Sequence, residues 1–242
     1  MSDPRSSKPP VARAPRNRWR EKYQSARTAA AYRVWRRKLV RLAGFHKNQT
    51  RVILEVGCGP GFFLNRIERW FPQFRILGFD IDPSSLRLAS VRSRRPRLIR
   101  ADAVHPPFRA GAFDAVCAFQ VIEHLASPEL FLRETKRILK DRGILLLSTP
   151  NPHGIAARIL AKKWQGIRHD HMSLRGPDEW ASALDAAGFK ILDRGTTGLT
   201  GFPLLRWPPL ALISWVPMTL FGYFPWKLGE SLMLISRKRE AA

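Results

Sequence analysis

Three glycines at alternating positions form the pattern in this sequence that is best suited to hold a ligand. Gly57, Gly59 and Gly61 follow an apolar run at residues 51–56. Glycines after a first strand let the backbone turn tightly and approach a bound molecule closely. The spacing is G-x-G-x-G, whereas a dinucleotide, whose pyrophosphate lies at a helix N-terminus, favours G-x-G-x-x-G. The pattern therefore favours a nucleotide-like ligand with no phosphate at the turn, and disfavours a nicotinamide-dependent reductase.

Three acidic residues stand where such a ligand needs carboxylates. Asp80 comes 21 residues after Gly59 and ends a second apolar run, where a carboxylate can accept from both ribose hydroxyls. Asp102 follows a third run and can accept from an adenine amino group, and Glu55 can orient an ammonium group. Together they indicate a nucleoside that bears an amino acid. As structural alternatives, Asp80 could be a turn residue and Asp102 could cap the turn before Pro106.

His124 is the best candidate for acid–base chemistry. It follows the fourth expected strand, at the carboxyl-terminal edge where ligands bind in open α/β sheets. If a hydroxyl is the group that reacts, a base there can remove its proton, and Glu123 can orient that base. The alternative is that His124 only starts a helix or supports other residues. The two cysteines, Cys58 and Cys117, are interpreted as packing residues.

Strands and helices alternate from residue 51 onward, which predicts parallel strand pairing and a doubly wound sheet. The order of the segments places the glycines and acids at strand ends. Expected strands are 51–56, 75–80, 97–101, 113–119, 143–149, 189–195 and 230–237, and expected helices are 62–71, 83–91, 127–139 and 177–187.

Basic residues dominate the composition and are concentrated at the start of the chain. The sequence has 42 Lys and Arg against 19 Asp and Glu, a net charge of +23. Such a chain is attracted to polyanions, either nucleic acid or an anionic membrane face. Residues 1–18 are expected to be a disordered basic tail, and residues 19–49 to contain a basic amphipathic helix. With two cysteines and no secretory signal, a cytoplasmic location is expected.

A long apolar segment precedes the last expected strand. Residues 207–226 contain no charged residue, but four prolines interrupt any single helix. A membrane-surface hairpin within 202–227 fits better than a transmembrane helix, and its tryptophans suit a membrane interface. A lid on its own domain or a dimer contact is the alternative. Membrane docking would account for both this segment and the basic charge, at the inner membrane face.

With these motifs in place, the chain resembles the class I S-adenosylmethionine-dependent methyltransferases, and within them the ubiquinone-biosynthesis-type branch (methyltransferase type 11/23-like). The resemblance covers roughly residues 50–195. The matching segments are VILEVGCGPGFFL, ILGFDIDPSSL, IRADA, FDAVCAFQVIEHLASP, GILLLSTPNPHG and HDHMSLRGPDEWASALDAAGFKIL.

The resemblance implies an α/β, Rossmann-like, doubly wound sheet of seven mostly parallel strands. Its last strand is antiparallel, the apolar insertion precedes that strand, and residues 50–242 form the methyltransferase domain. It implies S-adenosylmethionine as cofactor. By position, the cofactor pocket would be lined by Glu55, Gly57, Cys58, Gly59, Gly61, Asp80, Ile81, Asp102, Ala103 and Gln120.

The same relatives inform the metal and acceptor sites. Some carry an E-x-x-E-H arrangement that can hold a divalent metal, but this chain has Gln120 in the first position, before Glu123 and His124. Losing that carboxylate removes a hard oxygen ligand, so no metal is predicted. In relatives, the loop that contains His169 and His171 borders the acceptor pocket. Substrate contact is therefore one reading of these histidines, and local hydrogen bonding is the other. A zinc site would need more ligands.

The expected reaction is O- or C-methylation of a small or lipophilic acceptor. Two alternatives stay open. The net charge would also suit an RNA or other nucleic-acid methyltransferase, although the Asn/Asp-Pro-Pro-aromatic signature of base aminomethylases is absent after the fourth expected strand. The chain could also be a non-catalytic, membrane-associated protein that binds the cofactor.

Overall fold

A computed structural model describes residues 32–46, 49–164, 166–167, 170–197 and 227–240. Several sequence-based expectations lie outside these residues. They are the disordered tail 1–18, the first part of the basic helix at 19–31, His169, and all but the end of the apolar segment 202–227.

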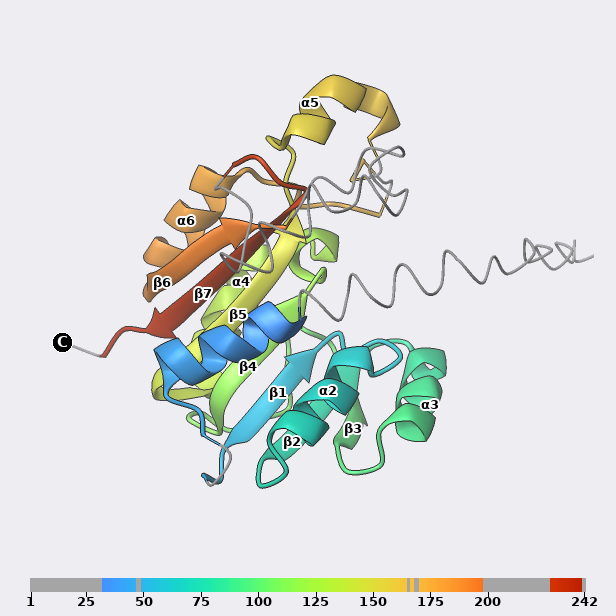
Figure 1. Cartoon of the computed structure of the whole chain (residues 1–242), viewed down its shortest axis with the longest axis vertical. Helices are drawn as coiled ribbons and strands as arrows, with labels where there is room; N and C mark the ends of the chain where they lie inside the picture. Colours follow the sequence, from blue (N-terminus) through green and yellow to red (C-terminus); the bar gives the residue numbers. More distant parts are fainter. Residues whose placement is uncertain (1–31, 47–48, 165, 168–169, 198–226, 241–242) are drawn as a thin grey trace, which may run out of the picture.

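Seven strands form one sheet in the order β3-β2-β1-β4-β5-β7-β6 (Figure 1). Neighbouring strands from β1 to β5 pair in parallel, and β7 lies antiparallel between β5 and β6. The predicted seven-stranded sheet with an antiparallel last strand is confirmed. The strands are β1 (Val52–Val56), β2 (Arg75–Asp80), β3 (Arg97–Arg100), β4 (Phe113–Phe119), β5 (Leu139–Pro150), β6 (Phe189–Thr196) and β7 (Ser231–Lys238).

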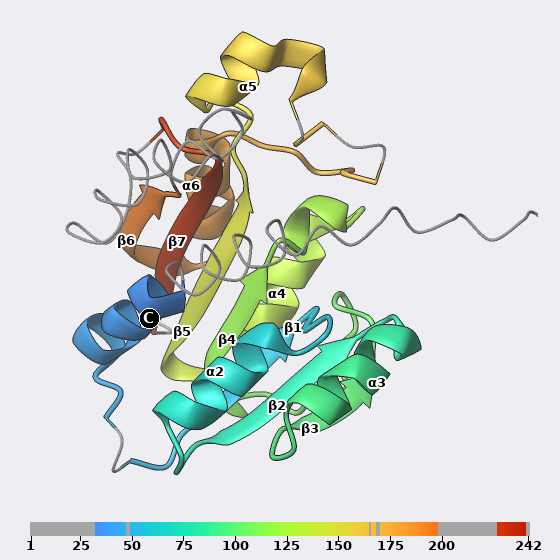
Figure 2. The same ribbon diagram turned by 45° about the vertical axis from the view of Figure 1, so that its right-hand side comes forward.

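The helices include all four expected in the domain, each within two residues of its expected bounds. Two 3-10 turns and a short helix after β5 were not expected, because these stretches are too short to show a helical period. Figure 2 shows the short helix α5 beyond the end of β5, at the opposite end of the molecule from α2 and α3. The elements are α2 (Phe62–Trp70), α3 (Pro83–Arg92), η1 (Ile122–His124), α4 (Pro128–Ile138), α5 (Ile155–Leu160), η2 (Ala161–Lys163) and α6 (Pro177–Ala186).

Two apolar cores form because successive strand residues face opposite sides of the sheet. In β1, Ile53 lies in a cluster with residues of α2, whereas the next residue, Leu54, lies in a cluster with residues of α4 and α6. In β5, Leu145 and Leu146 divide in the same way. Because helices cover both faces, the central strands are apolar on both sides, as expected for a buried parallel sheet.

The described part of the basic N-terminal helix covers residues 32–43. Val34, Trp35 and Leu39 are buried in the same core as α2, while Arg33, Arg36, Arg37 and Arg41 are exposed. The described part of this helix is therefore amphipathic. The helix ends before Gly44, whose φ of 65° favours glycine. Among the described residues, no helix has the length and apolar character needed to cross a bilayer.

Candidate active site

The glycine turn after β1 requires glycine for steric reasons. Gly57, Gly59 and Gly61 all have positive φ, at 60°, 49° and 75°. A Cβ on Gly57 would lie 2.5 Å from Cγ2 of Val121, and one on Gly61 would lie 3.0 Å from Cα of Ala89. A Cβ on Gly59 would meet nothing within 4 Å, so the open side of the turn is at its middle glycine. The turn therefore leaves room for a ligand against the backbone.

Asp80 holds this turn in place from the end of β2. Its Oδ2 accepts a hydrogen bond of 2.8 Å from the Gly59 backbone nitrogen, and its Oδ1 accepts one of 2.9 Å from Asp82 nitrogen. The half-exposed Asp80 is thus both a structural anchor and an available carboxylate. Ile81, beside it, exposes 66% of its surface, which is unusual for isoleucine and leaves an apolar surface next to the turn.

Asp102 and Ala103 lie just beyond the end of β3, the neighbour of β2. Asp102 is exposed, and its Oδ1 accepts a hydrogen bond of 3.0 Å from Val104 nitrogen. The Ala101 backbone nitrogen donates to the Asp80 carbonyl oxygen at 3.3 Å, which joins the two strand ends. The turn-capping role left open for Asp102 is therefore real, but its exposed carboxylate can also face a ligand.

Glu55 is a buried acid near the end of β1. It is 5% exposed, and its Oε2 accepts no hydrogen bond from any described residue. Burial raises the pKa of its carboxyl well above the ordinary value, opposed by a hydrogen bond from the Leu64 backbone. An uncompensated buried carboxylate is costly. A ligand ammonium near Glu55 would relieve that cost.

Tyr32 is a candidate site residue that the sequence did not identify. Its ring lies 5.0 Å from that of Phe63 and 6.3 Å from that of Phe119. Burial raises the pKa of its hydroxyl, and the charge of Glu55 adds to the rise. The N-terminal helix therefore places a neutral phenol close to the buried acid. The only sequence signal was the aromatic residue on the apolar face of that helix.

Gln120 and the cysteines complete the surroundings of the turn. Gln120 directly follows β4 with a φ of 57°, a strained value for a non-glycine residue, and its backbone nitrogen donates to the Ser148 carbonyl oxygen. Both cysteines are buried. Burial raises the pKa of Cys58 to about 12 and also raises that of Cys117. These thiols stay protonated near neutral pH, which agrees with a packing role, and Cys58 can reach a ligand only through its backbone.

The predicted base, His124, ends the 3-10 turn η1 and is oriented by a loop 46 residues away. Its Nδ1 lies 3.0 Å from the Asp170 carbonyl oxygen and 3.6 Å from Asp170 Oδ2. Ser173 fixes this loop, because its nitrogen donates to the Glu123 carbonyl oxygen and its hydroxyl donates to the Leu125 carbonyl oxygen. Asp170 is thus a second residue that the sequence did not single out. Its position between two histidines was the available signal.

His171 lies beside His124. Their ring centres are 4.7 Å apart in an edge-to-face arrangement, and His171 Nδ1 contacts the Gly166 carbonyl oxygen at 2.7 Å. Among the described residues, Glu123, His124 and His171 form a group whose possible ligand atoms all lie within 4.8 Å of one another, so they could hold a metal ion. His169 lies outside the described residues.

Glu123 leads to a prediction about stability. It is 1% exposed. Burial raises the pKa of its carboxyl from 4.5 to about 7, and the charge of Asp170 adds to the rise. Between these values the folded state holds a proton that the unfolded chain releases. The group's contribution to stability is therefore full below pH 4.5 and is lost as the pH rises through 7.

Glu123→Gln stays neutral and should escape this loss. Between pH 4.5 and pH 8, the difference in free energy of unfolding between the variant and the wild type is expected to shift by about 3 kcal/mol in favour of the variant. Urea unfolding at both pH values measures it. Parallel pH dependences of the two proteins would show that Glu123 ionises without cost in the folded state.

The residues around the turn fit S-adenosylmethionine. The Gly59 backbone is open, the Asp80 carboxylate is available for ribose hydroxyls, Asp102 is exposed for the adenine, and the unpartnered Oε2 of Glu55 suits an ammonium. All ten expected cofactor positions lie at the carboxyl ends of β1 to β4, and nine of them can offer a side chain or open backbone there. The exception is Cys58, whose side chain packs into the core below them.

The comparison with protein families agrees with this site. Residues 23–194 match the methyltransferase domain family, so this chain belongs to that family. The cofactor that the family implies is S-adenosylmethionine. The match includes the glycine turn, the three acids, and the loop that carries Asp170 and His171.

Two curated relatives are similar over part of the chain. Malonyl-[acyl-carrier protein] O-methyltransferase of Legionella pneumophila is 37% identical over 105 residues, which cover 42% of this chain and 37% of that protein. Ubiquinone biosynthesis O-methyltransferase of Dinoroseobacter shibae is 31% identical over 154 residues, which cover 59% of this chain and 61% of that protein. The matched region therefore spans less than two thirds of either relative.

Solved structures share the fold over most of the chain. A SAM-dependent methyltransferase from Archaeoglobus fulgidus has a TM-score of 0.61 at 18% identity, covering 91% of this chain and 98% of that chain. The [4+2]-cyclase SpnF has a TM-score of 0.64 at 22% identity, covering 90% of this chain and 82% of that chain. The fold alone thus does not specify the reaction.

Proposed function

We propose that this chain transfers a methyl group from S-adenosylmethionine to a small or lipophilic acceptor, by O- or C-methylation. The observation that carries the proposal is the contact between the two halves of the site. A Cβ on Gly57 would meet Val121, and Val121 directly precedes the turn that carries Glu123 and His124. The cofactor turn and the candidate base therefore meet at one edge of the sheet.

The cofactor, when bound, supplies a methyl group on a positively charged sulfur. Asp80 would hold the ribose, Asp102 and Ala103 would face the adenine, and Glu55 would orient the ammonium. Ile81 would give the adenine ring an apolar surface to pack on. Much of the catalysis in such a displacement comes from holding donor and acceptor in line, which is why the rigid turn matters.

His124 would remove the proton from an acceptor hydroxyl. With its Nδ1–H donating to the Asp170 carbonyl oxygen, the neutral imidazole keeps its Nε2 lone pair for that proton. The Asp170 carboxylate nearby would stabilise the imidazolium that forms. His171, packed on His124, would contact the acceptor, and His169 is proposed for the same role on sequence grounds.

The acceptor is best sought with labelled cofactor. Incubating the protein with S-adenosylmethionine labelled on its methyl group should transfer label into a total lipid extract, or into a malonyl-type carboxyl group like that of the Legionella relative's named substrate. Total RNA is the matched comparison, because the net charge of +23 would suit it. Label in RNA alone would favour the nucleic-acid alternative. Cofactor binding with no transfer to any acceptor would favour a non-catalytic protein.

A membrane location is proposed from the basic N-terminus and the apolar segment 202–227, which would bring a cytoplasmic enzyme to the inner membrane face. Basic residues near an anionic surface each contribute on the order of 1 kcal/mol. Flotation with anionic liposomes tests this, with a variant lacking 202–226 as the comparison. If neither protein floats and the variant is folded, membrane docking is wrong.

Removing divalent metals is expected to leave the activity unchanged. The group at Glu123 offers one carboxylate and two imidazoles, whereas Mg²⁺ and Ca²⁺ prefer a full set of oxygen ligands, and Gln120 stands where some relatives have a second carboxylate. Methyl transfer should therefore be equal before and after dialysis against EDTA. Loss of activity that Zn²⁺ or Mn²⁺ restores would reassign His124 from base to metal ligand.

A further inference from the structure

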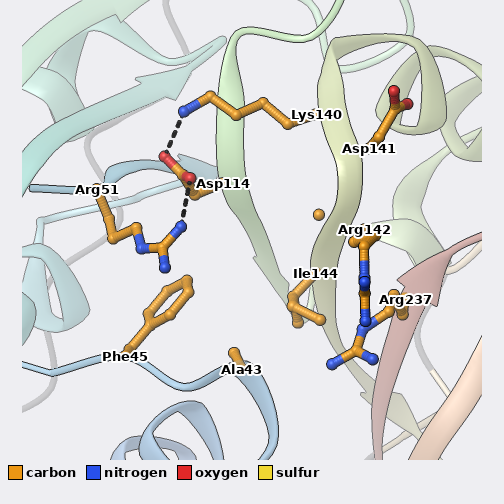
Figure 3. Close-up of a pocket in the computed structure, with 10 residues that line it drawn as sticks. Ala43, Phe45, Arg51, Asp114, Lys140, Asp141, Arg142, Ile144 and Arg237 are labelled. Atoms are coloured by element: carbon orange, nitrogen blue, oxygen red, sulfur yellow. Dashed lines mark hydrogen bonds and ion pairs between the residues drawn. The ribbon is translucent and has the colours of Figure 1, made fainter. Parts of the chain in front are cut away.

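A cavity of about 550 Å³ opens at the amino-terminal edge of the sheet (Figure 3). Its lining includes Arg51 just before β1, Asp114 near the start of β4, Lys140 and Arg142 near the start of β5, and Arg237 near the end of β7. Because β1, β4 and β5 are parallel and β7 is antiparallel, all of these positions lie at one edge. The glycine turn and His124 lie at the opposite edge, so this cavity is separate from the candidate active site.

Asp114 shares its negative charge between two of the cations. It is 9% exposed, and it accepts from Arg51 Nη1 at 3.1 Å, Lys140 Nζ at 2.8 Å and the Val52 backbone nitrogen at 2.8 Å. Figure 3 shows Arg51 and Lys140 reaching Asp114 from two sides. One carboxylate thus faces two positive side chains, which leaves an excess of positive charge.

The other two cations add to this excess. Arg237 Nη2 donates to the Leu42 carbonyl oxygen at 2.9 Å, but its Nε is buried and donates to no described residue. The Arg142 side chain is 70% exposed, and Glu240 approaches its Nε only to 3.7 Å. The second acid of the lining, Asp141, pairs with Lys238 at 3.2 Å. The lining thus carries four cationic side chains against two carboxylates, and this excess of positive charge favours an anion.

The backbone at Arg142 supports a binding role. Its φ is 61°, a conformation that costs energy for any residue but glycine. The next residue, Gly143, fits the irregularity in β5 at this point, where its register with β4 shifts, since a Cβ there would lie 2.8 Å from the Lys140 carbonyl oxygen. The chain thus places a guanidinium at a position where glycine would be less strained. Strain of this kind concentrates at ligand-binding positions.

We propose that this cavity binds a small phosphate-bearing anion. The planar guanidinium groups of Arg142 and Arg237 match the oxygens of a phosphate, and the Lys140 ammonium adds a point charge. Phe45, whose ring lies 5.5 Å from the Arg51 guanidinium carbon, gives the cavity an aromatic wall for the rest of the ligand. The site does not depend on the proposed methyl transfer.

The test uses the full-length protein and titrates inorganic phosphate and pyrophosphate by calorimetry at constant ionic strength. The main variant is Arg142→Gly, which removes the guanidinium and also relieves the backbone strain. Its matched control is Arg109→Gly, which removes one exposed arginine elsewhere. Because a hydrogen bond to a charged group contributes about 1.5–3 kcal/mol, Arg142→Gly should weaken pyrophosphate binding at least about tenfold, and the control should bind like the wild type.

Arg237→Lys provides the second measurement, since it keeps the positive charge but loses the planar pair of guanidinium donors. It should also weaken pyrophosphate binding at least about threefold, with its folding checked by thermal unfolding. Binding of S-adenosylhomocysteine, measured in parallel, should be unchanged in all three variants. No pyrophosphate binding by the wild type, or equal binding by the wild type, Arg142→Gly and folded Arg237→Lys, would overturn the proposal and leave the methyltransferase assignment intact.

Discussion

Asp80→Ala is expected to raise the dissociation constant of S-adenosylhomocysteine at least about 100-fold. Two ribose hydroxyls lose a charged acceptor, and a hydrogen bond of this kind contributes about 1.5–3 kcal/mol. The variant also loses the bond that holds the Gly59 nitrogen to Asp80 Oδ2, so the turn is no longer fixed for the ligand. Isothermal titration calorimetry measures this dissociation constant. Asp80→Asn keeps the shape of the side chain but not its charge, and its dissociation constant should fall between those of the wild type and Asp80→Ala.

Asp82→Ala is the matched control for this variant. Asp82 lies two residues away and caps α3, because its carboxylate accepts from the Ser84 and Ser85 nitrogens at 3.0 Å. Its removal should lower the midpoint of thermal unfolding by a few degrees without changing cofactor affinity more than about twofold. If Asp80→Ala is folded and binds nearly as well as the wild type, the assignment of the cofactor site is wrong.

His124→Gln is expected to lower kcat about 10²- to 10⁴-fold with a hydroxyl acceptor, the usual contribution of a positioned general base. Cofactor affinity should stay unchanged, because the His124 ring contacts Asp170 and is proposed to act on the acceptor, not on the cofactor. Asp170→Asn, which keeps the carbonyl oxygen that His124 Nδ1 contacts, should lower kcat by only about tenfold. Steady-state kinetics with saturating cofactor separate the two effects.

The control for His124 is His105→Gln. The His105 side chain is 74% exposed and lies 3.6 Å from Asp102. This variant therefore tests whether the loss of an exposed histidine near the proposed cofactor site is enough to lower kcat. We expect its kcat to equal that of the wild type. A His124→Gln variant that retains more than half of the wild-type kcat would leave His124 as a structural residue of the 3-10 turn.

The sequence by itself predicted the alternating strands and helices and the residues proposed for the cofactor half of the site, and the family resemblance added the seven-strand count and the antiparallel last strand. The β1 strand, its glycine turn and Asp80 lie within 30 residues of chain, and each depends on local properties: apolar strand residues, positive φ at glycine, and an acid at a strand end. The alternation of strands and helices then fixes the parallel order, because crossovers must return helices to the faces of the sheet. These features need no knowledge of distant contacts.

Only the tertiary structure decided the surroundings of His124, the other half of the candidate site. Asp170 and His171 lie in a loop without periodic sequence pattern, and they reach His124 because Ser173 bonds to the backbone of Glu123 and Leu125. Tyr32 reaches the vicinity of Glu55 because the N-terminal helix packs its apolar face on α2. The cations of the cavity at the amino-terminal edge of the sheet come from positions far apart in the chain, from Arg51 to Arg237. Such contacts depend on individual hydrogen bonds and packing between remote segments, and neither residue type nor spacing encodes them.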